Sequence, residues 1–191
     1  MDNPLFLFVG PSGCGKTTIT GLLESRYGYK AIRSFTTRRP RYVGEDGHTF
    51  ISNLAFGALE NLVAYTVYNG YHYGTTEDQL NNADLYVVDI PGVETLLQNY
   101  KNERAVFIFY FDSTVKTRID RMVDRNDSDA AIIKRLYNDE AFDWYRKLDA
   151  LVWNYKNIEH KNVELYKINA NEGIENVLEQ VLYYMKKDES E

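Results

Sequence analysis

The chain has 191 residues, of which 44% are hydrophobic and 26% charged, as expected for a globular protein with one substantial core. Its formal net charge of −6 excludes the broad basic surface that gathers nucleic acid or an anionic membrane, so we expect neither as a partner. No apolar run approaches the ~20 residues that span a bilayer and the N-terminal residues lack a signal-peptide pattern, so we expect a cytoplasmic protein.

The first predicted element is a buried strand, Leu5 to Val9, which leads directly into a glycine-rich loop. The loop fits the pattern G-x-x-x-x-G-K-[ST], in which backbone N–H groups surround a polyphosphate. A helix predicted from Thr17 to Tyr27 would point its N-terminus at that anion. We therefore expect a nucleoside triphosphate here, with Lys16 at the outer phosphates and the Thr17 hydroxyl on Mg²⁺. The loop consists of Gly10, Pro11, Ser12, Gly13, Cys14, Gly15, Lys16 and Thr17.

A short second strand, Tyr29 to Arg33, is predicted to deliver an arginine-rich segment that extends to Arg41. Guanidinium groups bind phosphate in a bidentate manner, and the Ser and Thr hydroxyls of the segment can complete the ligand set. A solvated basic loop is the alternative. Because Pro40 stiffens the segment and a triphosphate site lies upstream, we favour a second phosphate site.

A β-hairpin is the clearest signal in the next part of the chain, after a short helix predicted from Asn53 to Leu59. Its strands, Leu62 to Tyr68 and Tyr71 to Thr75, contain β-branched and aromatic residues and flank the turn pair Asn69-Gly70. Together with the arginine segment, the hairpin is expected to form a small substrate-binding lobe inserted between core elements.

The core is expected to resume with a strand from Leu85 to Ile90, followed by a helix from Val93 to Tyr100. Asp89 lies near the end of that strand, where phosphate-loop proteins commonly place a carboxylate that helps to hold Mg²⁺. Asp89 is therefore a candidate for the metal or for the substrate. The alternative is an acid that only accepts hydrogen bonds from nearby backbone N–H groups.

Two charged helices are predicted after the next strand, Ala105 to Phe111. One begins after Thr114, and the other runs from about Ala130 to Arg146. Phosphoryl transfer needs cations around the migrating group and the exclusion of water, so we interpret the pair as a movable lid. Ordinary solvated helix faces are the alternative. The candidate lid arginines are Arg121, Arg125 and Arg135.

The remaining predicted elements are strands from Ala150 to Asn154 and from Val163 to Ile168, and an amphipathic helix from about Ile174 to Lys186. Strands that alternate with helices indicate an α/β fold with a mostly parallel sheet covered on both faces.

These motifs together resemble the guanylate kinase family over about residues 5 to 155. GPSGCGKTT, which ends at Thr18, resembles the family's phosphate loop, and Tyr73-Gly74-Thr75 resembles its hairpin tip. Asp89, three residues before Gly92, is similar to an acid of the family's D-x-x-G element. The arginine segment resembles the part that binds the nucleoside monophosphate (NMP); its matching residues are Ser34, Thr36, Thr37, Arg38, Pro40, Arg41, Gly44 and Glu45.

The resemblance implies a P-loop NTPase-type fold with one domain, in which separate parts of the chain form a core, a substrate-binding lobe and a lid. It implies a core of about residues 1–33, 83–115 and 147–187, an NMP-binding lobe of about 34–82 and a lid of about 116–146. ATP and Mg²⁺ would lie on the phosphate loop, and Asn154, on a strand, would lie beside the adenine. Lys16, Arg38 and the lid arginines would stabilise the transferring group. The implied NMP-binding residues are Ser34, Arg38, Arg41, Glu45, Tyr73, Thr75 and Asp89.

The chain also departs from the family's pattern. Ala64 stands where the family has a glutamate that reads guanine, and the length between Arg41 and Phe50 differs, so either His48 or Phe50 replaces a phosphate-binding tyrosine. The first expectation is transfer from ATP to GMP. Alternatives are a kinase for another phosphorylated small molecule such as a ribose phosphate ester, a non-catalytic guanylate kinase-like binding module, and a nucleotide-switched regulator. The sequence does not identify a protein partner.

Overall fold

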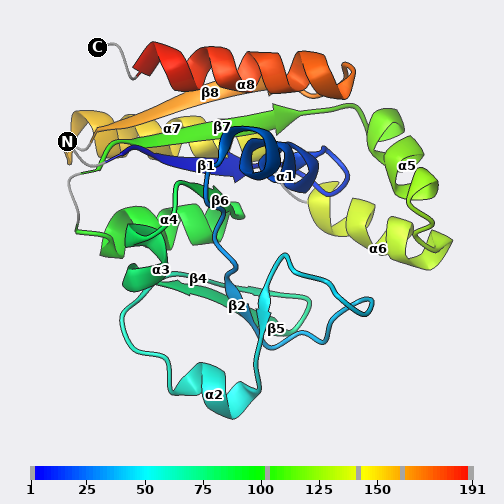
Figure 1. Cartoon of the computed structure of the whole chain (residues 1–191), viewed down its shortest axis with the longest axis horizontal. Coiled ribbons are helices and arrows are strands. Elements are labelled where there is room, and N and C mark those ends of the chain that lie inside the picture. Colours follow the sequence, from blue (N-terminus) through cyan, green and yellow to red (C-terminus); the bar gives the residue numbers. More distant parts are fainter. Residues whose placement is uncertain (1–2, 102–103, 141–142, 160–161, 189–191) are drawn as a thin grey trace.

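The computed structural model describes residues 3–101, 104–140, 143–159 and 162–188. Within these residues, the centre of the molecule is a four-stranded parallel sheet in the order β6-β1-β7-β8 (Figure 1). This arrangement confirms the predicted fold class, because helices connect the strands on both sides of the sheet. The strands are β6 Leu85–Val87, β1 Leu5–Val9, β7 Val106–Asp112 and β8 Val163–Asn169.

The two faces of this sheet bury different side chains, as the alternation along β1 shows. Leu7 packs in a cluster with the helices α4 and α7, whereas its neighbour Phe8 packs in a second cluster with α1 and α8. Both side chains are fully buried. Both faces of the sheet are thereby covered, and the carboxyl ends of its strands carry the site described below. The helices are α4 Ile90–Asn99, α7 Trp144–Asn157, α1 Lys16–Tyr27 and α8 Ile174–Asp188.

A second sheet, in the order β3-β2-β5-β4, forms the lobe between β1 and β6 in the sequence (Figure 1). The predicted hairpin is confirmed: β4 and β5 pair antiparallel across Asn69 and Gly70, whose φ angles of 54° and 79° suit a tight hairpin turn. The lobe is fixed to the core because the Tyr65 N–H donates to Thr95 Oγ1 of α4 at 3.0 Å. The lobe contains β2 Phe35–Thr36, β3 Thr49–Phe50, α2 Asn53–Gly57, β4 Leu62–Tyr68, β5 Tyr71–Thr76 and, at its end, α3 Glu77–Asn81.

Two further helices, α5 Val115–Asp124 and α6 Asp129–Glu140, project beyond the carboxyl ends of the parallel strands (Figure 1). The Thr114 hydroxyl accepts from the Thr117 N–H and caps α5, as the sequence predicted. The predicted helix from Ala130 to Arg146 includes residues 141–142, which lie outside the described part of the chain. The described residues on either side belong to α6 and α7.

The predicted strand from Ala150 to Asn154 is wrong, because these residues lie inside helix α7. The buried side chains of this helix are Leu148, Val152 and Tyr155, which recur at helical spacing. Asp143 caps the helix by accepting from the Arg146 N–H. The short apolar run was compatible with a strand or with a helix. The spacing of three to four residues between the buried side chains identifies the helix.

Two other predicted strands are shorter than expected. Tyr29 to Arg33 forms only an isolated bridge between Ala31 and Leu85, and the Ala31 N–H donates to the side chain of Glu24. The strand predicted to reach Ile90 ends at Val87, and α4 begins at Ile90. No helix in the described part of the chain has the length and apolarity that crossing a bilayer requires.

Candidate active site

The loop between β1 and α1 has the backbone geometry of an anion site. Gly10, Gly13 and Gly15 have φ angles of 149°, 80° and 100°, a region that favours glycine. A side chain at Gly10 or Gly13 would also approach a backbone carbonyl oxygen within 2.9 or 2.8 Å. Because Gly15 is the N-cap of α1, the first N–H groups of the helix have no intrahelical acceptor and can bind phosphate.

Lys16 lies where two cavities meet. Its Nζ donates to the carbonyl oxygens of Gly10 and Pro11, at 2.7 and 3.0 Å, so the ammonium group is folded back into the loop. Among the described residues that line these cavities, Lys16 is common to both. A phosphate on either side would therefore come within reach of the same cation.

The smaller cavity, of about 420 Å³, follows the outside of the loop and the start of α1, and it is called the phosphate-loop cavity below. Thr17 is exposed there, at the place where the sequence predicted a metal-binding hydroxyl. Within the described residues, no cluster of three or more His, Cys, Asp or Glu side chains could bind a metal on its own. A divalent cation held by Thr17 would therefore need the oxygens of the nucleotide as its other ligands. The predicted ATP-binding residues that line this cavity are Gly13, Cys14, Gly15, Lys16, Thr17 and Thr18.

Two of the predicted lid arginines also line the smaller cavity. Arg121 donates to the Cys14 carbonyl oxygen at 3.1 Å and to the Glu172 carbonyl oxygen at 3.2 Å, so its guanidinium already lies against the phosphate loop. Arg125 pairs with Asp127 in the turn that joins the two lid helices. Helix α5 and its C-cap thus bring two cations to the side of the loop where a triphosphate would lie.

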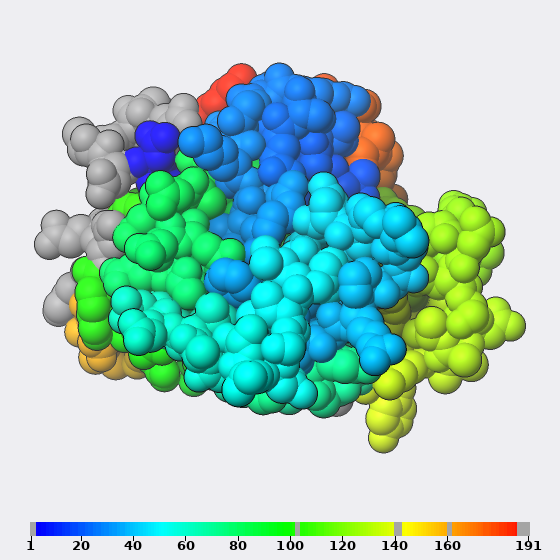
Figure 2. All heavy atoms as spheres, turned by 60° about the horizontal axis from the view of Figure 1, so that its bottom comes forward, coloured from blue at the N-terminus to red at the C-terminus, as the bar shows by residue number. Residues whose placement is uncertain are grey.

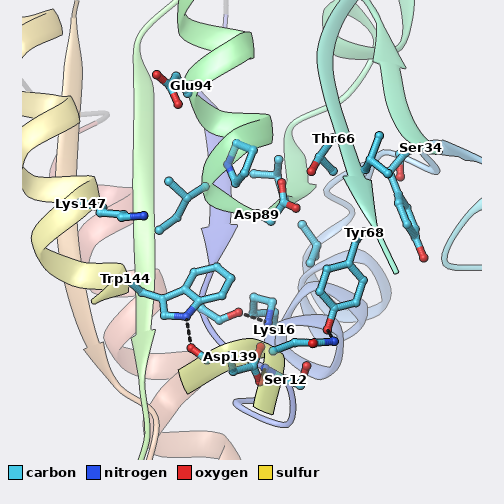
Figure 3. Close-up of a pocket in the computed structure, with 18 of the residues that line it drawn as sticks. Ser12, Lys16, Ser34, Thr66, Tyr68, Asp89, Glu94, Asp139, Trp144 and Lys147 are labelled. Carbon is cyan, nitrogen blue, oxygen red and sulfur yellow. Dashed lines mark hydrogen bonds between the residues drawn. The ribbon is translucent and has the colours of Figure 1, made fainter. Parts of the chain in front are cut away.

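The larger cavity, of about 940 Å³, opens between the parallel sheet, the hairpin lobe and α7 (Figure 3). Figure 3 shows Trp144 and Lys147 on one side and Thr66 and Tyr68 of β4 on the other, with Ser12, Lys16 and Asp139 at one end. Its volume is in the range of small-molecule sites. The predicted site residues that line it are Gly10, Ser12, Lys16, Ser34, Arg41, Tyr73, Asp89 and Asn154.

Arg38 and Glu45 form the buried support of this cavity's arginine segment. They make a bidentate pair at 2.8 and 3.1 Å, and their side chains are 10% and 7% exposed. Burial opposes ionisation of Glu45, but hydrogen bonds from Arg38 and the Arg41 N–H outweigh it and lower its pKa to about 2. The Arg38 guanidinium also lies 5.2 Å from the centre of the Phe50 ring. Neither Arg38 nor Glu45 lines the cavity, and together they fix the shape of the segment.

Arg41 is the guanidinium of this segment that lines the cavity, and it has charged neighbours of both signs, with Glu45 3.8 Å away. Its pKa is lowered by partial burial and then by the charges of Arg38 and Arg135. Arg135 belongs to α6, and Figure 2 shows the yellow-green helices α5 and α6 against the blue part of the lobe. An anion beside Arg41 would offset the repulsion that the neighbouring cations exert on its guanidinium. The arrangement therefore favours a phosphate beside Arg41.

Of the two residues that the sequence left open, His48 lines the cavity, whereas Phe50 does not. Its Nδ1 is 2.9 Å from Ser34 Oγ, and its ring is 5.4 Å from the ring of Tyr73. Burial and the nearby positive charge of Arg38 lower the pKa of His48 to about 4. The imidazole is therefore neutral at pH 7 and can hydrogen-bond to a phosphate oxygen only through its N–H group.

Asp89 is both a helix cap and a cavity residue. Its carboxylate accepts from the Gly92 N–H at 2.9 Å and caps α4. Burial raises its pKa, while hydrogen bonds from Gly92 and Thr66 and the charge of Lys16 act in the opposite direction. Asp89 therefore caps the helix, as the alternative interpretation expected, but it also bonds to a side chain and lines the cavity, so the substrate interpretation stays a prediction.

Ala64 and Thr75, two positions at which the chain was compared with the family's pattern, lie behind the cavity surface. Ala64 is fully buried in the core and pairs with Thr75 across the hairpin. Thr75 is also fully buried and does not line the cavity. Tyr86 does line it, and the Tyr86 phenol, whose pKa is raised by burial, has Thr75 as a neighbour. The polar groups on the cavity surface in front of these two residues therefore come from Tyr86, Thr66 and Asp89.

Asn154 was expected beside the adenine of ATP, but the structure does not bring it to the phosphate-loop cavity. It lies on α7 and lines the larger cavity together with Trp144, Lys147 and Leu151. The expectation depended on the strand that proved to be a helix. The polypeptide beside the phosphate loop is instead the turn between β8 and α8, where Arg121 bonds to the Glu172 carbonyl oxygen.

Sequence reasoning missed the contribution of α7 and of the end of α6 to the site. Asp139 accepts from the Ser12 N–H at 2.8 Å, although 127 residues separate the two in the chain. Trp144 donates to the Asp139 carbonyl oxygen at 2.9 Å and lines the cavity. No motif marks these residues, because they belong to the site only through long-range packing.

Comparison with known proteins identifies relatives of this chain. The chain is 32% identical over 150 residues to the guanylate kinase of Helicobacter pylori, covering 72% of each chain. It is 32% identical over 145 residues to that of Synechocystis sp., covering 69% of this chain and 75% of the relative. It is 28% identical over 161 residues to that of Fusobacterium nucleatum, covering 78% of this chain and 87% of the relative.

A solved structure has the same fold. The guanylate kinase of Anaplasma phagocytophilum matches with a TM-score of 0.53 at 14% identity, over 97% of this chain and 86% of that chain. No protein-family model matches the chain. The identities above and the phosphate-loop geometry show that the chain belongs to the guanylate kinase family of nucleoside monophosphate kinases.

Proposed function

We propose that the protein transfers the terminal phosphoryl group of ATP to a nucleoside monophosphate, with GMP as the favoured acceptor and GDP and ADP as products. The observation that carries the proposal is the position of Lys16, which lines both the phosphate-loop cavity and the larger cavity. A donor on one side and an acceptor on the other would meet at its ammonium group. The proposed reaction would take place in the cytoplasm.

The acceptor phosphate is assigned to the end of the larger cavity at Ser34, Arg41, His48 and Tyr73. Arg41 supplies the charge that faces the cavity, and the Arg38–Glu45 pair behind it holds the segment in place. The acceptor phosphate oxygen is itself the attacking group, so no side chain has to act as a nucleophile. Catalysis then comes from orientation and from electrostatic stabilisation of the transferring group.

The donor is assigned to the phosphate-loop cavity, with its phosphates on the N–H groups that begin at Gly15. Thr17 would hold Mg²⁺, which, when bound, neutralises charge on the outer phosphates. Arg121 and Arg125 approach from the lid, and Arg135 lies on the acceptor side near Arg41. The proposal keeps the division into an NMP-binding lobe, about residues 34–82, and a movable lid, about residues 116–146.

The base is assigned to the part of the cavity around Asp89, Thr66 and Tyr86. An ionised Asp89 is a hydrogen-bond acceptor, and guanine presents two adjacent N–H donors on one edge, at N1 and N2. This complementarity, together with the names of the relatives, supports GMP over acceptors that lack such an edge.

A second acceptor class, another phosphorylated small molecule such as a ribose phosphate ester, is favoured by one observation. Ala64 places no carboxylate at the base end, and the opposite wall of the cavity carries Lys147 and Asn154 from α7. Such an acceptor would use the same phosphate end. A non-catalytic role is disfavoured because the phosphate loop, from Gly10 to Thr17, is complete.

The test is an ADP-release assay with ATP and Mg²⁺ and a panel of acceptors that contains GMP, dGMP, AMP, CMP, UMP and ribose 5-phosphate. The proposal predicts the highest kcat/KM for GMP. Arg41→Met should raise the acceptor KM at least tenfold, whereas Arg39→Met, at an exposed arginine that does not line the cavity, should change it less than threefold. Preference for ribose 5-phosphate would select the second class, and release that is independent of every acceptor would contradict both.

A further inference from the structure

Two consecutive side chains at the end of lid helix α6 contact two different parts of the active site. Asp139 reaches the phosphate loop, where its Oδ2 accepts from the Ser12 N–H at 2.8 Å. The same oxygen accepts from the guanidinium of Arg118, on α5, at 3.0 Å. Asp139 thus connects both lid helices to the loop. The mechanism derived above does not use this buried acid.

The surroundings of Asp139 show why its charge is tolerated next to a phosphate site. Its side chain is 6% exposed and that of Arg118 is 5% exposed, so the pair is shielded from water. The pair is electrically neutral, and it therefore adds no net repulsion toward a bound phosphate. A side chain at Gly13 would meet the Arg118 carbonyl oxygen at 2.8 Å, so the loop packs directly on α5 at this point.

The preceding residue, Asn138, contacts the hairpin of the acceptor lobe. Its Nδ2 donates to Asn69 Oδ1 at 2.9 Å and lies 3.4 Å from the Tyr68 hydroxyl, both at the hairpin turn. In Figure 3, Tyr68 extends toward the end of the cavity that holds Ser12 and Asp139. One turn of α6 therefore joins the phosphate loop to the lobe that carries the acceptor.

We propose that Asp139 is a positioning residue for the phosphate loop and that Asn138 links that position to the acceptor lobe. Asp139 accepts a hydrogen bond from the Ser12 N–H, and this bond holds the first part of the loop in place. The N–H groups from Gly15 onward then remain directed at the phosphates. This inference rests on the proposed function, because it concerns the same loop, but binding of ADP alone can test it.

The decisive comparison separates the hydrogen bond to Ser12 from the buried charge. Asp139→Ala removes both the acceptor oxygen and the partner of Arg118, so an effect on folding would be mixed with an effect on the loop. Combining it with Arg118→Met removes the unpaired cation. Asp139→Asn with Arg118→Met keeps an oxygen that can accept from Ser12 and has no charge. Lys134→Ala, at an exposed residue of α6, is the matched control.

ADP affinity is measured by titration calorimetry without any acceptor, on variants whose cooperative thermal unfolding shows that they are folded. We expect Asp139→Ala/Arg118→Met to bind ADP at least tenfold more weakly than the wild type. Asp139→Asn/Arg118→Met and Lys134→Ala should stay within threefold of it. Equal affinity in the two double variants would overturn the role of Asp139, whether both were weak or both normal.

Asn138→Ala tests the link to the lobe. It should leave ADP affinity within threefold of the wild type, and it should raise the KM of the best acceptor and amide exchange in residues 65–72 without lowering kcat by more than threefold. Unchanged acceptor KM and unchanged exchange would overturn the link. If the wild type transferred phosphate to no acceptor, the proposed function would fail, while the ADP comparison would still decide the role of Asp139.

Discussion

The support for the arginine segment can be tested by replacing Glu45 with glutamine. Glu45 accepts two hydrogen bonds from Arg38 and one from the Arg41 N–H, the last at 2.6 Å. Glutamine has nearly the same shape but no charge, and one of its terminal atoms is a donor that must face a donor. The change therefore removes the negative charge that faces the Arg38 guanidinium while leaving the packing almost unaltered.

The magnitude of the effect follows from the pKa of Glu45. A pKa of about 2 in the folded protein, against about 4.3 in an unfolded chain, corresponds to about 3 kcal/mol of stability at pH 7. Since solvent at the rim of the lobe screens part of this interaction, we expect Glu45→Gln to lower the free energy of unfolding by about 2 kcal/mol.

The sign of the pH dependence is fixed because the folded-state pKa lies below the unfolded-state value. The unfolded chain binds more protons between about pH 4.3 and pH 2, so the contribution is complete above that range and is lost as the pH falls through it. The difference between wild type and variant should therefore fall to about half by pH 3.

The assay is urea denaturation followed by far-ultraviolet circular dichroism at pH 7 and pH 3. Asp46→Asn is the matched control, because Asp46 is 86% exposed and lies 3.7 Å from Arg33. It should change the free energy of unfolding by less than about 0.5 kcal/mol. Equal stability of Glu45→Gln and wild type at pH 7, or a difference that does not shrink at pH 3, would refute the reasoning.

Two further predictions concern other buried groups. His48 has a folded-state pKa of about 4, below its unfolded value, so acidification from pH 7 to pH 5 should destabilise the wild type by about 1–2 kcal/mol more than His48→Gln in thermal unfolding; parallel pH profiles would refute it. Arg104 donates to the carbonyl oxygens of Asn3, Leu80, Pro4 and Ala83, so Arg104→Met should cost at least about 3 kcal/mol in urea denaturation. The ADP affinity of this variant, measured by calorimetry, should stay within threefold of the wild type. A loss of stability below about 1 kcal/mol would contradict the predicted contribution of the Arg104 hydrogen bonds.

The parts of the site that are local in sequence were predictable from sequence. The strand, loop and helix around Lys16 are adjacent in the chain, and glycine is required where φ is positive, so the motif carries its own geometry. The hairpin at Asn69-Gly70 is local for the same reason. Arg41 and Tyr73 reach the same cavity because the hairpin strand β5 pairs with β2, which is part of the arginine segment.

The parts that depend on distant packing were not predictable. The apolar run at Ala150 was short enough to suit a strand, and only its spacing with Leu148 and Tyr155 identifies a helix. Helix α7 then supplies a whole wall of the larger cavity. Asp139 meets Ser12 through the fold of the lid, and no sequence pattern encodes a contact between residues so far apart.

The most direct test of the account follows the phosphoryl group itself. Enzyme, Mg²⁺, ATP labelled at the terminal phosphate and GMP are mixed, and the labelled products are separated after a single turnover. The account predicts that the label appears in GDP, and that Lys16→Ala lowers the transfer rate by at least a thousandfold while the variant stays folded. Label found only in inorganic phosphate, with GMP and with every other monophosphate, would contradict a cleft in which donor and acceptor meet at Lys16.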